Sequence, residues 1–147
     1  MNFPQLWKDR QYGAAIAAAP FFWGILLLIG YSPAGLSFPL EDPQAFLRFA
    51  LIYPVIEELA FRGLIQESFL RASWGKRRIA GVSVANAATS VLFAASHLLF
   101  HSPLRAAGVF FPSLIFGHFR DRYGRLVPSI CLHVFYNAGY LLFFPGQ

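Results

Sequence analysis

Long apolar segments alternate along the chain with short segments that carry most of its charged residues. A helix that crosses the hydrocarbon core of a bilayer needs about 20 mostly apolar residues. On this criterion we predict about five membrane-spanning helices, over residues 12–31, 46–65, 79–100, 104–119 and 126–144. The fourth is short for a span and contains Pro112. The pattern therefore predicts an all-α fold, a polytopic membrane helical bundle that forms one integral membrane domain over residues 1–147.

The composition also indicates that the lipid bilayer is the solvent of this chain. Charged residues make up 13% of it and hydrophobic residues 56%, whereas a soluble domain has about 25% charged residues. The mean hydropathy is +0.50. The net charge of +5 comes from short clusters between apolar segments, which argues against a nucleic-acid partner. Cys131 is the single cysteine, so a disulfide-stabilised scaffold is excluded.

The first apolar segment, over residues 12–31, has two interpretations. The small residues of 17–19 resemble a signal-peptide cleavage site. However, the apolar core of a signal peptide is about 7–15 residues long and precedes its cleavage site, whereas this segment continues well beyond residue 19. We therefore expect an uncleaved anchor helix.

The distribution of lysine and arginine predicts the orientation, because these residues are enriched in cytoplasmic loops. One side carries nine cations, at Lys8, Arg10, Arg71, Lys76, Arg77, Arg78, Arg120, Arg122 and Arg125. The other side carries only Arg105, together with the acidic residues Glu41 and Asp42. We predict that the N-terminus is cytoplasmic and the C-terminus is outside. The small size favours a bacterial inner membrane.

Ionisable residues at membrane depth are energetically costly and usually functional. The second segment contains Glu57, Glu58 and Arg62. Glu58 and Arg62 are four residues apart, so they lie on one helical face and are predicted to form an ion pair. Glu57 points about 100° away from Glu58, so a structural ion pair does not account for it. Pro54 cannot donate a hydrogen bond to the preceding turn, which predicts a kink beside the carboxylates.

Two further segments each carry a polar cluster. In the third, His97 continues a polar face with Ser90 and Asn86, and Phe93 lies one turn below it. His101 is four residues beyond His97 but lies next to Ser102 and Pro103, and we expect it at the membrane interface. In the fifth segment His133 and Asn137 share one helical face. Hydrogen bonding between helices alone would also explain this last pair.

Together these residues suit hydrolysis by an activated water. Glu57 would accept a proton from the water, and His97 would hold and polarise it. His133 and Asn137 would donate hydrogen bonds to the oxyanion that forms on the scissile carbonyl group. The spacing suggests no Ser-His or Cys-His dyad, and a His-Glu-x-x-His zinc helix is absent from the sequence.

Three other functions remain as alternatives. Glu57, His97 and His133 could ligate zinc in a zinc-dependent membrane peptidase. The chain could instead be a non-catalytic membrane scaffold or an immunity protein. A proton-coupled carrier is disfavoured because such carriers show repeated halves or matching broken helices, and this sequence has no internal repeat.

Three motifs resemble, in order, those of the CAAX-processing and bacteriocin-processing (CPBP, or Abi) family of intramembrane glutamic endopeptidases. They are Glu57-Glu58-x-x-x-Arg62, Phe93-x-x-x-His97 and His133-x-x-x-Asn137. The resemblance covers residues 53–140 and leaves the anchor helix of 12–31 outside this protease core. Each motif alone is weak, but all three in order within hydrophobic helices are quite specific.

The resemblance implies a catalytic set and a substrate class. By this similarity Glu57 activates the water, His97 shares it, and His133 and Asn137 form the oxyanion hole. Glu58, Arg62 and Phe93 then support the site, with no cofactor and no metal. The substrate would be a membrane-anchored protein or peptide: a prenylated protein, a leader peptide or a C-terminal sorting anchor.

Overall fold

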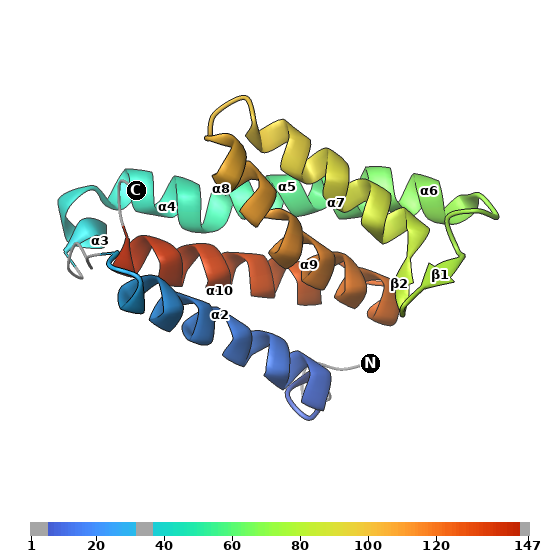
Figure 1. Cartoon of the computed structure of the whole chain (residues 1–147), viewed down its shortest axis with the longest axis horizontal. Helices are drawn as coiled ribbons and strands as arrows, with labels where there is room; N and C mark the ends of the chain where they lie inside the picture. Colours follow the sequence, from blue (N-terminus) through green and yellow to red (C-terminus); the bar gives the residue numbers. More distant parts are fainter. Residues whose placement is uncertain (1–5, 32–36, 145–147) are drawn as a thin grey trace. The chain divides into compact units, whose positions relative to one another are not determined.

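The structure is a computed structural model that describes residues 6–31 and 37–144. The chain divides into two compact units. Figure 1 labels their helices and strands. Unit 1 comprises the chain up to Ile56 together with the chain from Cys131 onward, and unit 2 comprises Glu57–Ile130.

Unit 1 contains the N-terminal helix α2 (Arg10–Leu28). The Asp9 side chain caps it by accepting a hydrogen bond from the Gln11 backbone. Among the described residues, α2 is the one helix that is both long and apolar enough to cross a membrane. The helix predicted over 12–31 is thus present, but it ends at Leu28 because Gly30, at φ +96°, turns the chain.

Helix α10 (Val127–Phe143) corresponds to the fifth predicted segment, and most of it belongs to unit 1. Its glycine at position 139 lets the Trp23 ring of α2 approach the helix backbone, since a Cβ atom there would collide with the indole. The Tyr136 hydroxyl donates a 2.6 Å hydrogen bond to the Ala15 carbonyl. Close packing and one partly buried hydrogen bond therefore join α2 to α10.

The second predicted segment is helical throughout and longer than expected. Instead of 46–65, helical structure extends from Pro43 to Arg71, because Asp42 caps its start and accepts from the Ala45 backbone. It follows the short helix α3 (Phe38–Glu41). Its consecutive parts are α4 (Pro43–Leu47), the π-helix η1 (Arg48–Ile52), α5 (Tyr53–Glu58), the π-helix η2 (Leu59–Gln66) and α6 (Glu67–Arg71).

The π-helix η1 ends two residues before Pro54 and shows how the chain accommodates this proline. The Tyr53 backbone N–H bonds to the Arg48 carbonyl, five residues back, instead of to the Phe49 carbonyl. In the π-helical pattern the next donor would be Pro54, which has no N–H. The Phe49 carbonyl is therefore available to a partner from outside its own helix.

Unit 2 contains η2 and α6, a small hairpin, and three further helices. The hairpin interrupts the otherwise all-α fold. These elements are β1 (Arg78–Ile79), β2 (Val82–Ser83), α7 (Val84–His97), α8 (Pro103–Gly108) and α9 (Phe110–Tyr123).

The predicted start of the third helix at residue 79 was wrong. The strands pair in antiparallel register, Arg78 with Ser83 and Ile79 with Val82. Both turn residues have positive φ, 49° at Ala80 and 84° at Gly81, as a tight hairpin turn requires. The helix begins only at Val84, where the Ser83 hydroxyl caps it.

The fourth predicted helix, over 104–119, is in fact two helices. Pro112 has no N–H to donate to the Gly108 carbonyl, and the chain breaks at Val109 between α8 and α9. Helix α9 then continues to Tyr123 and ends at Gly124, which adopts φ +63°.

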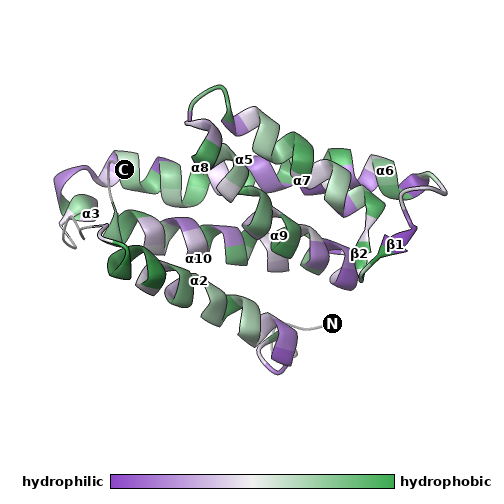
Figure 2. Ribbon diagram, viewed as in Figure 1, coloured by the Kyte–Doolittle hydropathy of each residue, from purple (hydrophilic) through white to green (hydrophobic). Residues whose placement is uncertain are grey.

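Unit 2 buries many polar side chains and exposes many large apolar ones. Its fully buried polar residues include Glu58, Arg62, Gln66, Thr89, Ser90 and Ser113. Its exposed large apolar residues include Leu59, Leu64, Val91, Leu92 and Phe111. A water-soluble domain shows the opposite arrangement, whereas helices surrounded by lipid turn apolar side chains outward. Figure 2 shows hydrophilic residues concentrated around the β1–β2 hairpin, at one end of this unit.

Candidate active site

The predicted ion pair between Glu58 and Arg62 is present in unit 2. Arg62 Nη1 lies 3.1 Å from Glu58 Oε1, and both side chains have 0% exposure. The pair forms because the two residues are four apart on one helical face. The prediction that Glu58, rather than its neighbour, is the partner of Arg62 is confirmed.

Arg62 is held from several sides in the core of unit 2. Its guanidinium carbon lies 4.8 Å from the centre of the Phe93 ring and 5.6 Å from that of the Phe116 ring. Its Nη2 donates to the Ser113 carbonyl at 2.9 Å and to the Ser113 hydroxyl at 2.8 Å. Stacked aromatic rings and a planar array of donors fix a guanidinium in one orientation. Arg62 thereby fixes the Glu58 side chain.

The contact with Ser113 was not predicted. Arg62 and Ser113 are 51 residues apart, and helical spacing relates only residues within one helix. The available signal was a serine beside Pro112 in an apolar segment. Gln66 was missed as well, although it continues the face of Glu58 and Arg62 by one more turn.

Polar contacts continue along η2 and α9 beyond Arg62. Gln66 Nε2 donates to the Gly117 carbonyl at 3.0 Å and to Asp121 at 2.7 Å. Asn86 of α7 donates to the Leu114 carbonyl at 2.9 Å. A Cβ atom at position 117 would collide with the Asn86 amide, so this glycine allows α7 and α9 to approach closely. The predicted polar face of α7 thus serves packing at its Asn86 end.

His97 lies at the last residue of α7 and contacts Phe93, as predicted. The two ring centres are 4.5 Å apart. His97 Nδ1 lies 2.8 Å from the Phe93 carbonyl oxygen. A carbonyl oxygen only accepts hydrogen bonds, so Nδ1 carries the proton, and in the neutral ring Nε2 is an acceptor. This tautomer can accept a hydrogen bond from a water molecule.

In unit 2, Glu57 and His97 each lie one helical turn from the contact between their two helices. The helices η2 and α7 are antiparallel, because the short hairpin turns the chain between them. They meet where Arg62 and Phe61 contact Phe93, with ring centres of the two phenylalanines 5.0 Å apart. Glu57 lies one helical turn before Phe61, and His97 lies one helical turn after Phe93.

His101 lies beyond the end of α7 at His97. It is exposed, and its ring centre is 5.7 Å from that of His97. Burial of the ring, with smaller effects from the charges of His97 and Arg105, lowers the pKa of His101. His101 is therefore largely neutral near pH 7.

The remaining two candidates lie on α10 in unit 1. His133 is 4% exposed. Asn137 Nδ2 donates at 3.2 Å to the Phe49 carbonyl, the group that Pro54 and the π-helix leave without an intrahelical donor. Asn137 therefore makes a hydrogen bond between helices, which was the structural explanation given above for the pair His133 and Asn137. Because an amide nitrogen has two hydrogens, it can still donate to a second acceptor.

The structure thus brings five of the seven candidate residues together in unit 2. They are Glu57, Glu58, Arg62, Phe93 and His97. His133 and Asn137 share a face of α10 in unit 1. The first group combines a carboxylate, a buried ion pair and an imidazole that can accept from water.

Comparison with known proteins agrees with the resemblance read from the motifs. A family model described as type II CAAX prenyl endopeptidase Rce1-like matches residues 39–139, more than half of the chain. A search of curated proteins and a search of solved structures each found no significant match. Proteins of the matched family are membrane-integral helical proteases, which act on membrane-associated peptide substrates. The chain therefore belongs to the Rce1-like family of type II CAAX prenyl endopeptidases.

Proposed function

We propose that this protein is a metal-independent glutamic intramembrane endopeptidase. Glu57 is the general base, His97 positions the attacking water, and His133 and Asn137 donate to the oxyanion. The observation that carries the proposal is the contact of Phe61 and Arg62 with Phe93, because Glu57 and His97 each lie one helical turn from it. The buried pair of Glu58 and Arg62 lies beside this contact. The family match supports it, because its members are proteases.

The proposed reaction has two proton transfers. Glu57 takes a proton from the water, whose oxygen bonds to the scissile carbonyl carbon, while the Nε2 atom of His97 accepts the water's other hydrogen bond. The carbonyl oxygen becomes an oxyanion that His133 and Asn137 stabilise by hydrogen bonds. The C–N bond then breaks, and Glu57 returns its proton to the leaving amine.

The proposal assigns different tasks to different parts of the chain. Residues 53–140 form the protease core, and the helix predicted over 12–31 is an anchor outside it. We further propose about five membrane spans with a cytoplasmic N-terminus, in a bacterial inner membrane.

We propose that the site opens toward the outer face of the membrane. Glu57 is fourteen residues from the end of α6 and His97 is thirteen residues from the start of α7, so both lie about 20 Å from the basic end of unit 2. If the basic end is cytoplasmic, the site lies in the outer half of a core about 30 Å thick. This depth suits trimming of an exported protein's membrane anchor, whereas prenylated-protein processing requires cytoplasmic access.

Cysteine labelling tests this orientation. In a Cys131→Ser background, Ser96→Cys and Tyr140→Cys are expected to react with a membrane-impermeant thiol reagent added from outside the cell. Ser73→Cys is the matched control, because Ser73 is exposed at the basic end of unit 2. It is expected to react only from the cytoplasmic side. Labelling of Ser96→Cys only from the cytoplasmic side would overturn the outward orientation.

Removal of metal ions distinguishes the glutamic mechanism from the zinc alternative. Cleavage of a membrane-anchored peptide by the purified protein in liposomes is expected to survive strong chelators unchanged, because Glu57 itself activates the water. A zinc peptidase would lose its activity and regain it with added zinc. The liposome assay compares chelated protein with untreated protein and with protein given zinc after chelation.

The same assay addresses a non-catalytic scaffold. A scaffold would show no cleavage of any membrane-anchored peptide. Prenylated peptides and transmembrane sorting anchors are supplied side by side, so that the result also ranks the two substrate classes.

A further inference from the structure

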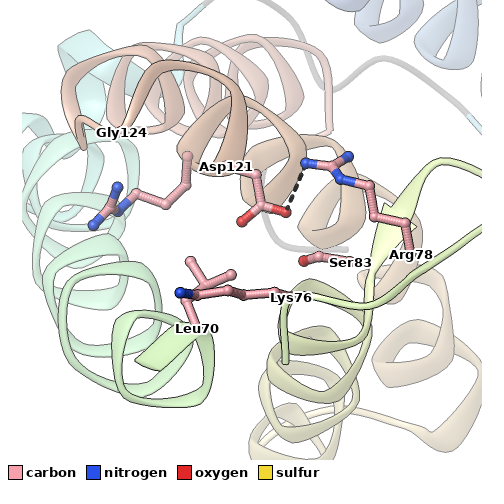
Figure 3. Close-up of a pocket in the computed structure, with 7 residues that line it drawn as sticks. Leu70, Lys76, Arg78, Ser83, Asp121 and Gly124 are labelled. Atoms are coloured by element: carbon pink, nitrogen blue, oxygen red, sulfur yellow. Dashed lines mark ion pairs between the residues drawn. The ribbon is translucent and has the colours of Figure 1, made fainter. Parts of the chain in front are cut away.

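Unit 2 contains a cavity of about 230 Å³ at the end opposite His97 (Figure 3). It lies between the end of α6, the hairpin and the end of α9. Its lining residues are Leu70, Lys76, Arg78, Ser83, Arg120, Asp121 and Gly124. The catalytic proposal uses none of them.

Cations dominate this cavity. Three of its seven lining residues are Lys76, Arg78 and Arg120, and one is a carboxylate, Asp121. Asp121 accepts a hydrogen bond from Gln66 at 2.7 Å and lies 3.9 Å from Arg78, as Figure 3 shows for the ion pair. The single carboxylate is thus already partnered within the protein.

Arg120 is the most informative of the three cations. Its side chain is 12% exposed, and Nη2 pairs with Glu67 at 2.6 Å. Its Nε atom is buried and, within the described chain, has no hydrogen-bond acceptor. Since Nε is buried, Arg120 meets the cavity through the exposed part of its side chain, beside the guanidinium group of Arg78.

The general excess of cytoplasmic cations does not explain this arrangement. That excess requires lysine and arginine in loops, a requirement that exposed residues such as Arg77, Arg122 and Arg125 already meet. It does not require a largely buried arginine beside a cavity. Basic cavities between the ends of membrane helices are typical binding sites for phosphate-bearing lipid head groups.

We propose that this cavity binds a phosphate group, as carried by an anionic phospholipid of the cytoplasmic leaflet. Lys76 supplies a mobile ammonium group, and the two guanidinium groups supply planar donors that match phosphate oxygens. Leu70 adds an apolar wall next to the helices that face lipid. A bound head group would join the ends of α6 and α9 to the hairpin. The site is independent of the proposed proteolytic chemistry.

Lipid binding by the full-length purified chain tests the proposal. The protein is exchanged into phosphatidylcholine nanodiscs with increasing phosphatidylglycerol, and bound phosphatidylglycerol is counted by native mass spectrometry. The double variant Lys76→Gln/Arg78→Gln is expected to bind it about 10-fold more weakly. The matched control Arg77→Gln/Arg125→Gln removes the same charge from the same end but outside the cavity, and is expected to change affinity less than about 2-fold.

The outcomes separate the proposal from its alternatives. If lipid affinity falls equally in both double variants, or in neither, the proposal is overturned, because a specific site in this cavity requires the residues that line it. Inorganic phosphate is titrated in parallel: saturable binding that depends on Lys76 and Arg78, without lipid binding, would support the phosphate site and assign it to a soluble ligand. If the double variant fails to fold, Lys76→Gln alone is used. Its side chain is exposed, and an unchanged affinity would overturn the proposal.

Discussion

Glu57→Gln is expected to abolish cleavage of a membrane-anchored peptide, with a loss of at least about 10²–10⁴-fold in turnover. The substitution keeps the size of the side chain and removes only its ability to accept a proton. Glu58 makes the 3.1 Å ion pair with Arg62, and the charge of Glu57 acts on Arg62 more weakly than that of Glu58. The thermal stability of the variant in detergent is therefore expected to stay close to that of the wild type, whereas turnover is lost. Turnover and melting temperature are measured on the same preparation.

Matched variants make this result specific. Glu41→Gln removes an exposed carboxylate of α3 and is expected to retain full activity. His97→Ala, His133→Ala and Asn137→Ala are expected to be inactive as well, since removal of one oxyanion donor typically costs about 10²–10³-fold. Wild-type turnover by Glu57→Gln would show that the glutamic mechanism is wrong. If Glu41→Gln also loses cleavage, the loss of activity in these variants reflects damage to the fold and not the loss of a catalytic group.

Helical spacing predicted contacts within one helix well. The pairing of Glu58 with Arg62 and the contact of Phe93 with His97 both follow from a separation of four residues. The same rule did not find Ser113, the hydrogen-bond partner of Arg62, because that contact joins two helices. Packing between helices depends on how they cross, which the spacing within either one does not specify.

Backbone irregularities were harder to predict than apolar segments. Pro54 indicated a disturbance of the helix but not its form. The form is a π-helix that exposes the Phe49 carbonyl to Asn137, and it depends on which carbonyl accepts the hydrogen bond of each preceding N–H group. The residues around Ala80 continue an apolar run, so hydropathy extended the third helix over a hairpin. The positive φ angles of the two turn residues, one of them not a glycine, leave no trace in hydropathy. The sequence did contain two signals for this hairpin: Gly81, a turn-forming residue, and Ser83, a helix N-cap. Hydropathy alone does not detect them.

Separating Arg62 from Glu58 is expected to produce the largest loss of stability. Both groups have 0% exposure, and removal of one leaves the other as a buried charge, at a cost of about 3–5 kcal/mol. Arg62→Ala is therefore expected to lower both stability and activity. The measurement is the free energy of unfolding in mixed detergent micelles for Arg62→Ala, Glu58→Ala and the double variant. The double variant is expected to lose clearly less than the sum of the single losses.

The pair of Glu67 and Arg71 provides the matched control, because it has the same i,i+4 spacing in the next segment of the helix. Its atoms are 3.8 Å apart, and the arginine side chain is 78% exposed. Solvent screens such a pair, so its coupling energy is expected to be at most about 0.5 kcal/mol. The losses of unfolding free energy in the control pair are expected to add. If the losses for Glu58→Ala and Arg62→Ala also add, burial does not couple Glu58 to Arg62. The orientation of Arg62 would then come from Phe93, Phe116 and Ser113 alone.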